Sequence, residues 1–148
     1  MTVYAHFGTK DELLEALVER AVRRASEALE AAEPDSGPPR QALQRLIEVS
    51  WRELERHRST ARAASEQLTP EVQRRTHAAA MQQLRRLAER GRRSGDFRGD
   101  LSTDWMVTSC ISLMHAAVDE VRAGRMSAKN AQRALLSSIP DLWTATDG

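Results

Sequence analysis

The chain has 148 residues, a formal net charge of +1 and a single cysteine, Cys110. Its composition of 41% hydrophobic, 29% charged and only 4% aromatic residues argues against a β-rich fold and predicts one all-α domain. One cysteine excludes an intrachain disulfide, which favours a reducing compartment, so we expect a cytoplasmic protein. Runs of 18 apolar residues are absent from the sequence, so we expect no membrane partner.

Capping signals and apolar periodicity predict the first elements. Thr9 is a suitable N-cap, and Glu12 follows at the capping-box spacing, which predicts a helix from about residue 10 to 32. The segment 33–39 contains three prolines and a glycine and predicts a loop. A second helix is expected from Pro39 to about residue 56, and a short alanine-rich helix over 60–68.

The second half of the chain predicts three more helices. Thr69, Pro70 and Glu71 are typical of a helix start, and that helix is expected to end near residue 93, before a turn over 94–100. Ser102 is expected to cap the next helix, which Gly124 ends. The last helix begins after Ser127, and Pro140 is expected to kink or terminate it.

The segment 105–118 contains no Asp, Glu, Lys or Arg, and its apolar residues extend most of the way around the expected helix. A helix that is apolar on several sides must be covered on several sides. We therefore predict that the last two helices pair with those of a second copy in a four-helix interface; the alternative is that both faces are internal core. The predicted interface residues are Val107, Cys110, Ile111, Met114, Val118, Leu135, Ile139 and Leu142.

The first residues carry a motif. Thr2, Tyr4, His6, Phe7, Lys10 and Leu13 have the spacing T-x-Y-x-H-F-x-x-K-x-x-L. This pattern resembles the end of the recognition helix of the helix-turn-helix in the tetracycline-repressor (TetR) family. The resemblance implies a TetR-like helical bundle of about six helices whose last two helices form the dimer. It divides the chain into a remnant of the recognition helix, residues 1–9, and a ligand-binding and dimerisation domain, residues 10–148.

The resemblance also implies partners. Thr2, Tyr4, His6 and Lys10 would contact operator DNA in the complete protein, with Lys10 near a phosphate. In the family, about three helices form the head, so two of them are expected to be missing before Thr2. A shortened chain, a start codon assigned too late and a true remnant all remain open. Because an isolated recognition helix this short is unstable, tight operator binding is not expected from these residues alone.

An unknown small-molecule effector is the other partner that the resemblance implies. Apolar pockets with few polar groups are usual for such ligands, and the candidate lining residues are Trp51, Leu54, Met81, Leu84, Met114 and His115. The sequence carries no metal-ligand spacing, phosphate loop or catalytic triad order, so we expect no metal, no cofactor and no enzyme activity. The resulting hypothesis is a ligand-responsive repressor; the alternative is a dimeric helical small-molecule-binding module or antagonist without DNA-binding activity of its own.

Overall fold

A computed structural model describes residues 8–56 and 70–144, apart from the side chains of 21, 25, 70–76 and 79. The described residues form five α-helices and no strand longer than a single bridge, which confirms the all-α prediction. The helices are α1 (Lys10–Ala31), α2 (Pro39–Arg56), α4 (Pro70–Ser94), α5 (Thr103–Arg122) and α6 (Ala128–Trp143). The helix predicted over 60–68 lies outside the described residues. No helix in the described ranges is long and apolar enough to cross a membrane.

Three helices begin at the caps that the sequence predicts. The hydroxyl of Thr9 accepts a hydrogen bond from the Glu12 amide at 3.1 Å, and Ser102 and Ser127 cap α5 and α6 in the same way. The Glu12 carboxylate accepts from the Gly8 amide at 2.8 Å, one residue earlier than a standard capping box places it. These local bonds fix where α1, α5 and α6 start, whatever the helices later pack against.

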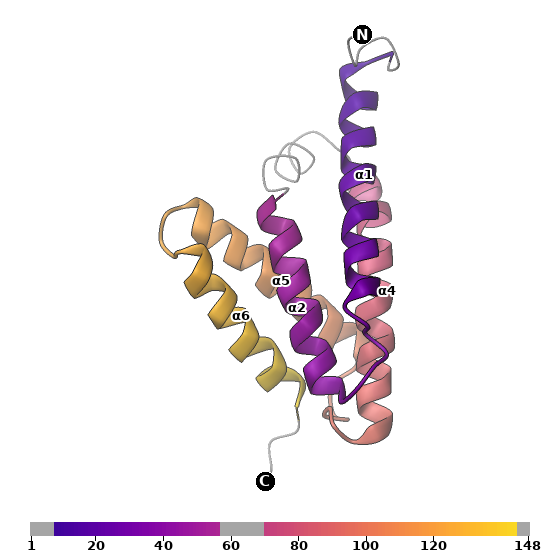
Figure 1. Ribbon diagram of the computed structural model, residues 1–148, viewed down its shortest axis with the longest axis vertical. Coiled ribbons are helices and arrows are strands. Elements are labelled where there is room, and N and C mark those ends of the chain that lie inside the picture. The colour runs from indigo at the N-terminus through magenta and orange to yellow at the C-terminus, as the bar shows by residue number, and fades with distance from the viewer. Residues whose placement is uncertain (1–7, 57–69, 145–148) are drawn as a thin grey trace.

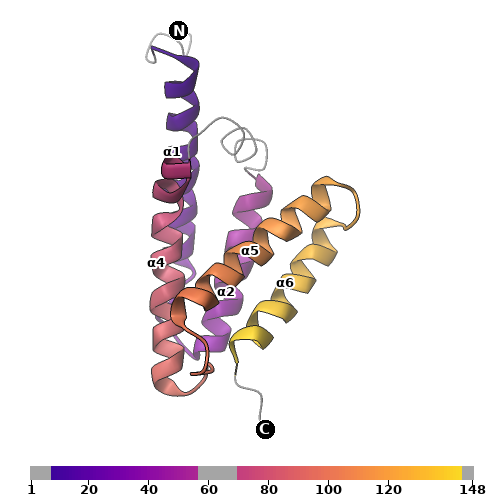
Figure 2. The same ribbon diagram turned by 180° about the vertical axis from the view of Figure 1, so that it is seen from behind.

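The helices are arranged around one hydrophobic core. Figures 1 and 2 show α1 lying beside α4, α5 and α6 forming a hairpin, and α2 between these two pairs. The core takes Leu43, Leu46, Ile47 and Trp51 from α2, and buried residues of α4, α5 and α6 complete it. Apolar residues at helical spacing on α2 therefore face inward, as the periodicity predicts.

A buried corner joins the end of α4 to the ends of the α5–α6 hairpin. The Phe97 amide donates to the Gly91 carbonyl at 2.9 Å, which folds the Phe97 ring back over α4. That ring meets the Trp143 ring edge-on at a centroid distance of 5.3 Å, and Trp143 Nε1 donates to the Met106 carbonyl at 3.2 Å. The Arg98 amide donates to the Trp143 carbonyl at 2.9 Å. These contacts set the position of α5 and α6 relative to α4.

Pro140 lies inside α6 and is fully buried. The helix continues for one more turn to Trp143, so it does not end at the proline. A proline one turn before the C-terminus removes one intrahelical hydrogen bond, and the Thr144 amide closes the last turn by donating to the Pro140 carbonyl at 2.9 Å. The expected termination at Pro140 does not occur, because α6 continues to Trp143.

Candidate functional site

The most apolar face of α5 is turned inward, which corrects the predicted dimer interface. Val107 and Cys110 are 0% exposed and Met114 is 6% exposed within the single chain. On α6, Leu135 and Ile139 are likewise buried. These five side chains pack in the core against α2 and the other helices and have almost no surface to offer a second copy. Of the predicted interface residues, Ile111, Val118 and Leu142 keep partial exposure.

The exposed face of α5 has a different composition. Trp105 is 57% exposed, and the exposed residues at the following helical spacings are Thr108, Ser112 and Ala116. This face carries small, uncharged side chains with one large aromatic ring at its N-terminal end. Side chains of this size allow another helix to approach closely, and tryptophan is enriched at protein–protein interfaces.

α6 also carries small exposed residues. Ala134, Ser137 and Ser138 are exposed, and Leu136 is half-buried beside the core. The exposed residues of both helices also include charged ones, such as Asp104, Asp119 and Arg133. We give the name α5–α6 face to the exposed uncharged set Trp105, Thr108, Ser112, Ala116, Ala134, Ser137 and Ser138. α5 and α6 pack directly on each other as a hairpin.

The predicted ligand-pocket residues come from three helices, and five of the six belong to the hydrophobic core or pack against it. Trp51, Leu84 and Met114 are buried members of the core cluster, at 3%, 8% and 6% exposure. Leu54 and Met81 are half-buried and pack against that cluster. The first three therefore belong to the packed core, while Leu54 and Met81 keep part of their surface exposed.

His115, the sixth predicted pocket residue, is exposed. Its ring is 6.0 Å from the His77 ring, centroid to centroid, which places the two histidines where α5 packs on α4. Local burial of the imidazole lowers the pKa of His115 below its usual 6.5, the neighbouring His77 lowers it further, and Asp119 opposes both. His115 is therefore a neutral, polar group at the α4–α5 contact near pH 7.

Sequence reasoning missed two buried polar residues near this region. Glu53 on α2 is 8% exposed and its carboxylate lies 3.6 Å from the Arg56 guanidinium. Gln83 on α4 is 6% exposed, and its Oε1 atom accepts no hydrogen bond in the described part of the chain. A buried amide oxygen without a donor is costly, so it is a position where a ligand donor or a water would be favoured. The sequence gave little indication that Glu53 and Gln83 are buried, since glutamate and glutamine are common on the solvent-exposed faces of helices.

Of the four predicted DNA contacts, only Lys10 lies within the described residues. It is the first residue of α1 and is exposed. Thr2, Tyr4 and His6 lie outside the described ranges, so their proposed contacts stay predictions. The aromatic opening therefore connects directly to the exposed N-terminal end of α1.

The arginine-rich segment 85–98 is largely engaged in structural contacts. Arg85 bonds Asp104 of α5 at 2.7 Å, and Arg92 donates to the Thr103 hydroxyl at 2.9 Å. Arg98 donates to Asp100 and lowers the pKa of that carboxyl to about 2. A shallow, open hollow of about 370 Å³ lies beside Glu89, Arg92, Arg93 and Gly99. Within the described ranges, no three His, Cys, Asp or Glu side chains meet in a way that could hold a metal.

Comparison with known proteins identifies the fold. Among solved structures, the TetR-family regulator PfmR from Thermus thermophilus superposes with a TM-score of 0.76 and 27% sequence identity, over 94% of this chain and 79% of PfmR. A protein assigned to the TetR family from Rhodococcus sp. gives a TM-score of 0.68 at 19% identity, over 96% of this chain and 79% of that one. A protein of unknown function from Rhodococcus sp. RHA1 superposes with a TM-score of 0.78 at 17% sequence identity, over 95% of this chain and 76% of that one.

The chain thus has the all-α fold of TetR-type transcriptional regulators. No family model matches the sequence, and no curated protein does. The N-terminal turns of α1 extend beyond the N-terminal end of α4 (Figure 1).

Proposed function

We propose that the chain is the effector-binding and dimerisation body of a TetR-type transcriptional regulator, acting as a ligand-responsive repressor when joined to a complete DNA-binding head. The observation that carries this proposal is the superposition on PfmR over 94% of the chain. The N-terminal motif, with Lys10 at the start of α1, supports it from the sequence. Effector binding would change the equilibrium between two orientations of α1 with different operator affinity.

The proposed dimer uses the α5–α6 face rather than the buried residues that the sequence suggested. Two observations support this surface: Trp105 is 57% exposed, and the segment 105–118 carries no charged side chain. Helix pairs in such bundles pack at interaxial distances of about 8–10 Å, which small side chains permit. A two-fold axis against this face would bring two copies of α5 and α6 into one four-helix bundle.

Analytical ultracentrifugation of a variant with an added charge tests the proposed dimer. Ser112→Arg places a long cation in the middle of the α5–α6 face, so we expect the particle mass to fall from twice the 16.6 kDa chain mass to that mass. Gln82→Arg adds the same side chain at an exposed position of α4 and is expected to remain dimeric. A wild-type monomer, or an unchanged dimer in Ser112→Arg, would contradict the proposed interface.

The proposed effector site lies over Leu54 and Met81, with Trp51, Leu84 and Met114 as its apolar floor. Accessible apolar surface next to a packed floor is suited to a small apolar molecule with few polar groups. A thermal-shift screen of such molecules should find ligands that raise the unfolding temperature of the wild type. Met81→Arg is expected to abolish that shift and Gln82→Arg to keep it. Equal shifts in both variants would place the ligand elsewhere.

DNA binding is tested with a chimera, because the head residues lie before α1. The helix-turn-helix head of PfmR is joined in front of Lys10, and the chimera is incubated with duplexes that PfmR itself selects from a random pool. We expect the chimera to bind these duplexes as a dimer and the Ser112→Arg chimera to lose binding. A dimeric chimera that binds effector but no duplex would instead favour a ligand-binding module without regulatory DNA activity.

A further inference from the structure

Two histidines that are far apart in the sequence meet where α4 packs on α5. His77 and His115 are separated by 38 positions, yet the centroids of their rings are 6.0 Å apart, with the ring planes at 55° to each other. Both residues are exposed, so an ion can reach the rings from solvent. The motifs that predict metal sites place at least two ligands within a few positions of each other, so the sequence predicts none here.

The distance between the two rings fits one ion bound to a nitrogen of each. A bond from zinc to a histidine nitrogen is about 2.0–2.1 Å long. With roughly 1.2 Å from that nitrogen to the ring centre, the ion lies about 3.2 Å from each centroid, and the centroids are at most about 6.4 Å apart. A tetrahedral angle at the ion requires about 5.2 Å between the centroids. Rotation of the imidazoles about χ2, which is broad for histidine, can close the remaining distance of about 0.8 Å.

The protonation state of His115 is suited to a metal ligand. Local burial of the imidazole lowers its pKa below the usual 6.5, His77 lowers the pKa further, and Asp119 opposes both. The ring is therefore neutral near pH 7, and one of its nitrogens keeps the lone pair that a metal ion needs. Asp119 lies one turn further along α5, where its negative charge favours a cation, but its carboxylate already pairs with Arg122.

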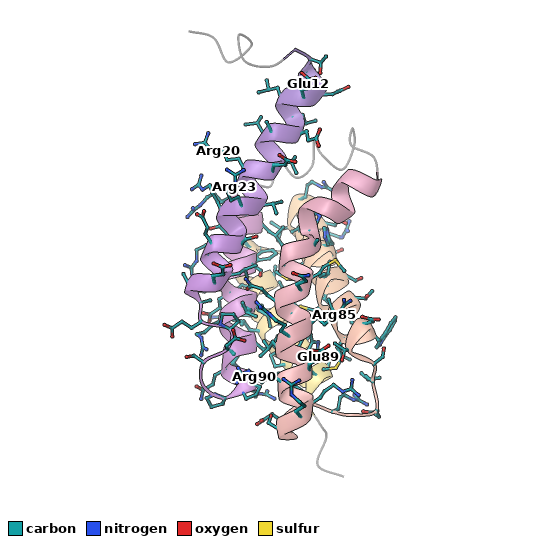
Figure 3. The ribbon with its side chains drawn as sticks, turned by 90° about the vertical axis from the view of Figure 1, so that its right-hand side faces the viewer. Glu12, Arg20, Arg23, Arg85, Glu89 and Arg90 are labelled. Carbon is teal, nitrogen blue, oxygen red and sulfur yellow. The ribbon has the colours of Figure 1, made fainter. Side chains whose placement is uncertain are left out.

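The described arginines of α4 and α5 that are nearest in sequence to the two histidines are paired with carboxylates. On α5 this residue is Arg122, which bonds Asp119. On α4 it is Arg85, which bonds Asp104 and lies eight positions after His77, about 12 Å along the helix axis. Figure 3 shows Arg85 in the half of α4 that leads to its C-terminal end. These two positive charges are therefore neutralised by carboxylates of α5.

The two rings select a class of ion. Imidazole nitrogens bind Zn²⁺, Cu²⁺ and Ni²⁺, whereas Mg²⁺ and Ca²⁺ prefer oxygen ligands. Within the described ranges, no third His, Cys, Asp or Glu side chain completes a metal-binding group with them. Structural zinc sites use four protein ligands. An ion held by two histidines therefore keeps water in its other positions and exchanges with the solvent.

We propose that His77 and His115 bind one divalent transition-metal ion of the Zn²⁺, Cu²⁺ and Ni²⁺ class, in an open two-histidine site that links α4 to α5. Because 38 positions separate the ligands, they come together only in the folded chain, so the ion stabilises the native state. The site does not rest on the proposed regulatory function, since it requires neither DNA nor a second copy.

Titration of Zn²⁺ into the untagged full chain tests the site, with calorimetry and NMR of the histidine rings as readouts. Near pH 7 we expect one ion per chain and shifted ring resonances for two of the four histidines. His77→Gln and His115→Gln should each weaken binding by at least about tenfold, because even the loss of a hydrogen-bond partner of a ligand costs about 10–100-fold. Zn²⁺ at about 100 times its dissociation constant should raise the folding equilibrium constant of the wild type about 100-fold.

His6→Gln and His57→Gln are the matched controls, because they change the other two histidines, which lie outside the described residues; both should bind Zn²⁺ as the wild type does. A loss of binding in either control as large as in His77→Gln would overturn the proposal. Binding that both His77→Gln and His115→Gln retain would overturn it as well.

Pulsed electron paramagnetic resonance of the Cu²⁺-loaded wild type needs no variant that folds. The spectrum should show two imidazoles coupled to the ion, and His115→Gln should show one. A single coupled imidazole in the wild type, or no binding of either metal, would overturn the two-histidine site.

Discussion

Gly91 offers a direct test of how α4 is joined to the α5–α6 hairpin. It lies inside α4, and a Cβ at this position would be 2.6 Å from Cγ of the Phe97 ring. Phe97 is 2% exposed and is held between α4 and the edge of Trp143, so its ring has little room to move. Gly91→Ala therefore forces the ring outward.

The expected effect follows from two opposing contributions. Alanine is favoured over glycine inside a helix by about 1 kcal/mol. Moving the Phe97 ring away removes part of its burial, about 1.5–3 kcal/mol in full, and its edge contact with Trp143, about 0.5–1.5 kcal/mol. We expect the steric contribution to dominate, and Gly91→Ala to lower the free energy of unfolding by about 1–3 kcal/mol. Gly99→Ala is the control, because a Cβ there meets nothing within 4 Å.

Urea unfolding of four proteins measures the coupling: wild type, Gly91→Ala, Phe97→Ala and the double variant. Phe97→Ala alone should cost about 3–5 kcal/mol. Once the ring is absent, the added methyl group has no collision partner, so Gly91→Ala should be neutral or stabilising by up to about 1 kcal/mol. If Gly91→Ala destabilised the Phe97→Ala background as strongly as the wild type, the collision would not be the cause and the reasoning would be refuted.

Three further predictions concern single groups. Burial raises the pKa of the Cys110 thiol to about 12. The native chain should therefore not react with a thiol reagent at pH 8, whereas the urea-unfolded chain should react with one equivalent. Rapid labelling of the native chain would contradict the buried position. Because the pKa of His115 is lowered in the folded chain, the unfolded chain binds that proton more readily, and the free energy of unfolding should fall as the pH decreases from 7 through 6.5 and toward the lower folded pKa. His115→Gln should reduce this slope, and an identical slope would argue against the shift. Trp143→Phe removes the donor to the Met106 carbonyl and should lower the free energy of unfolding by about 1–3 kcal/mol, measured by urea titration; a neutral substitution would show that this bond contributes little.

The helices and their boundaries could be predicted from the sequence, because the signals that fix them are local. Thr9, Ser102 and Ser127 bond to amides three residues ahead, so each cap acts within one turn whatever the rest of the chain does. The inward face of α2 and α4 was predicted for the same reason: apolar residues at helical spacing, such as Trp51 and Leu84, lie in the core. Their role in a ligand pocket stays a prediction. The comparisons then support the TetR-type fold that the first residues suggested.

The direction in which α5 faces was decided by the tertiary structure. Its sequence is apolar on several sides, so periodicity could not tell the side that packs on α2 from the side left exposed, and Cys110 and Met114 were placed at a dimer surface when they lie in the core. The contacts of Arg45 and Arg90 with the loop after α1 could not be predicted from the sequence either. The two arginines are separated by 45 positions and donate to backbone carbonyls, which every residue presents. Local composition fixes which segments become helices; only the packing of those helices decides which of several similar faces is buried and which side chains meet.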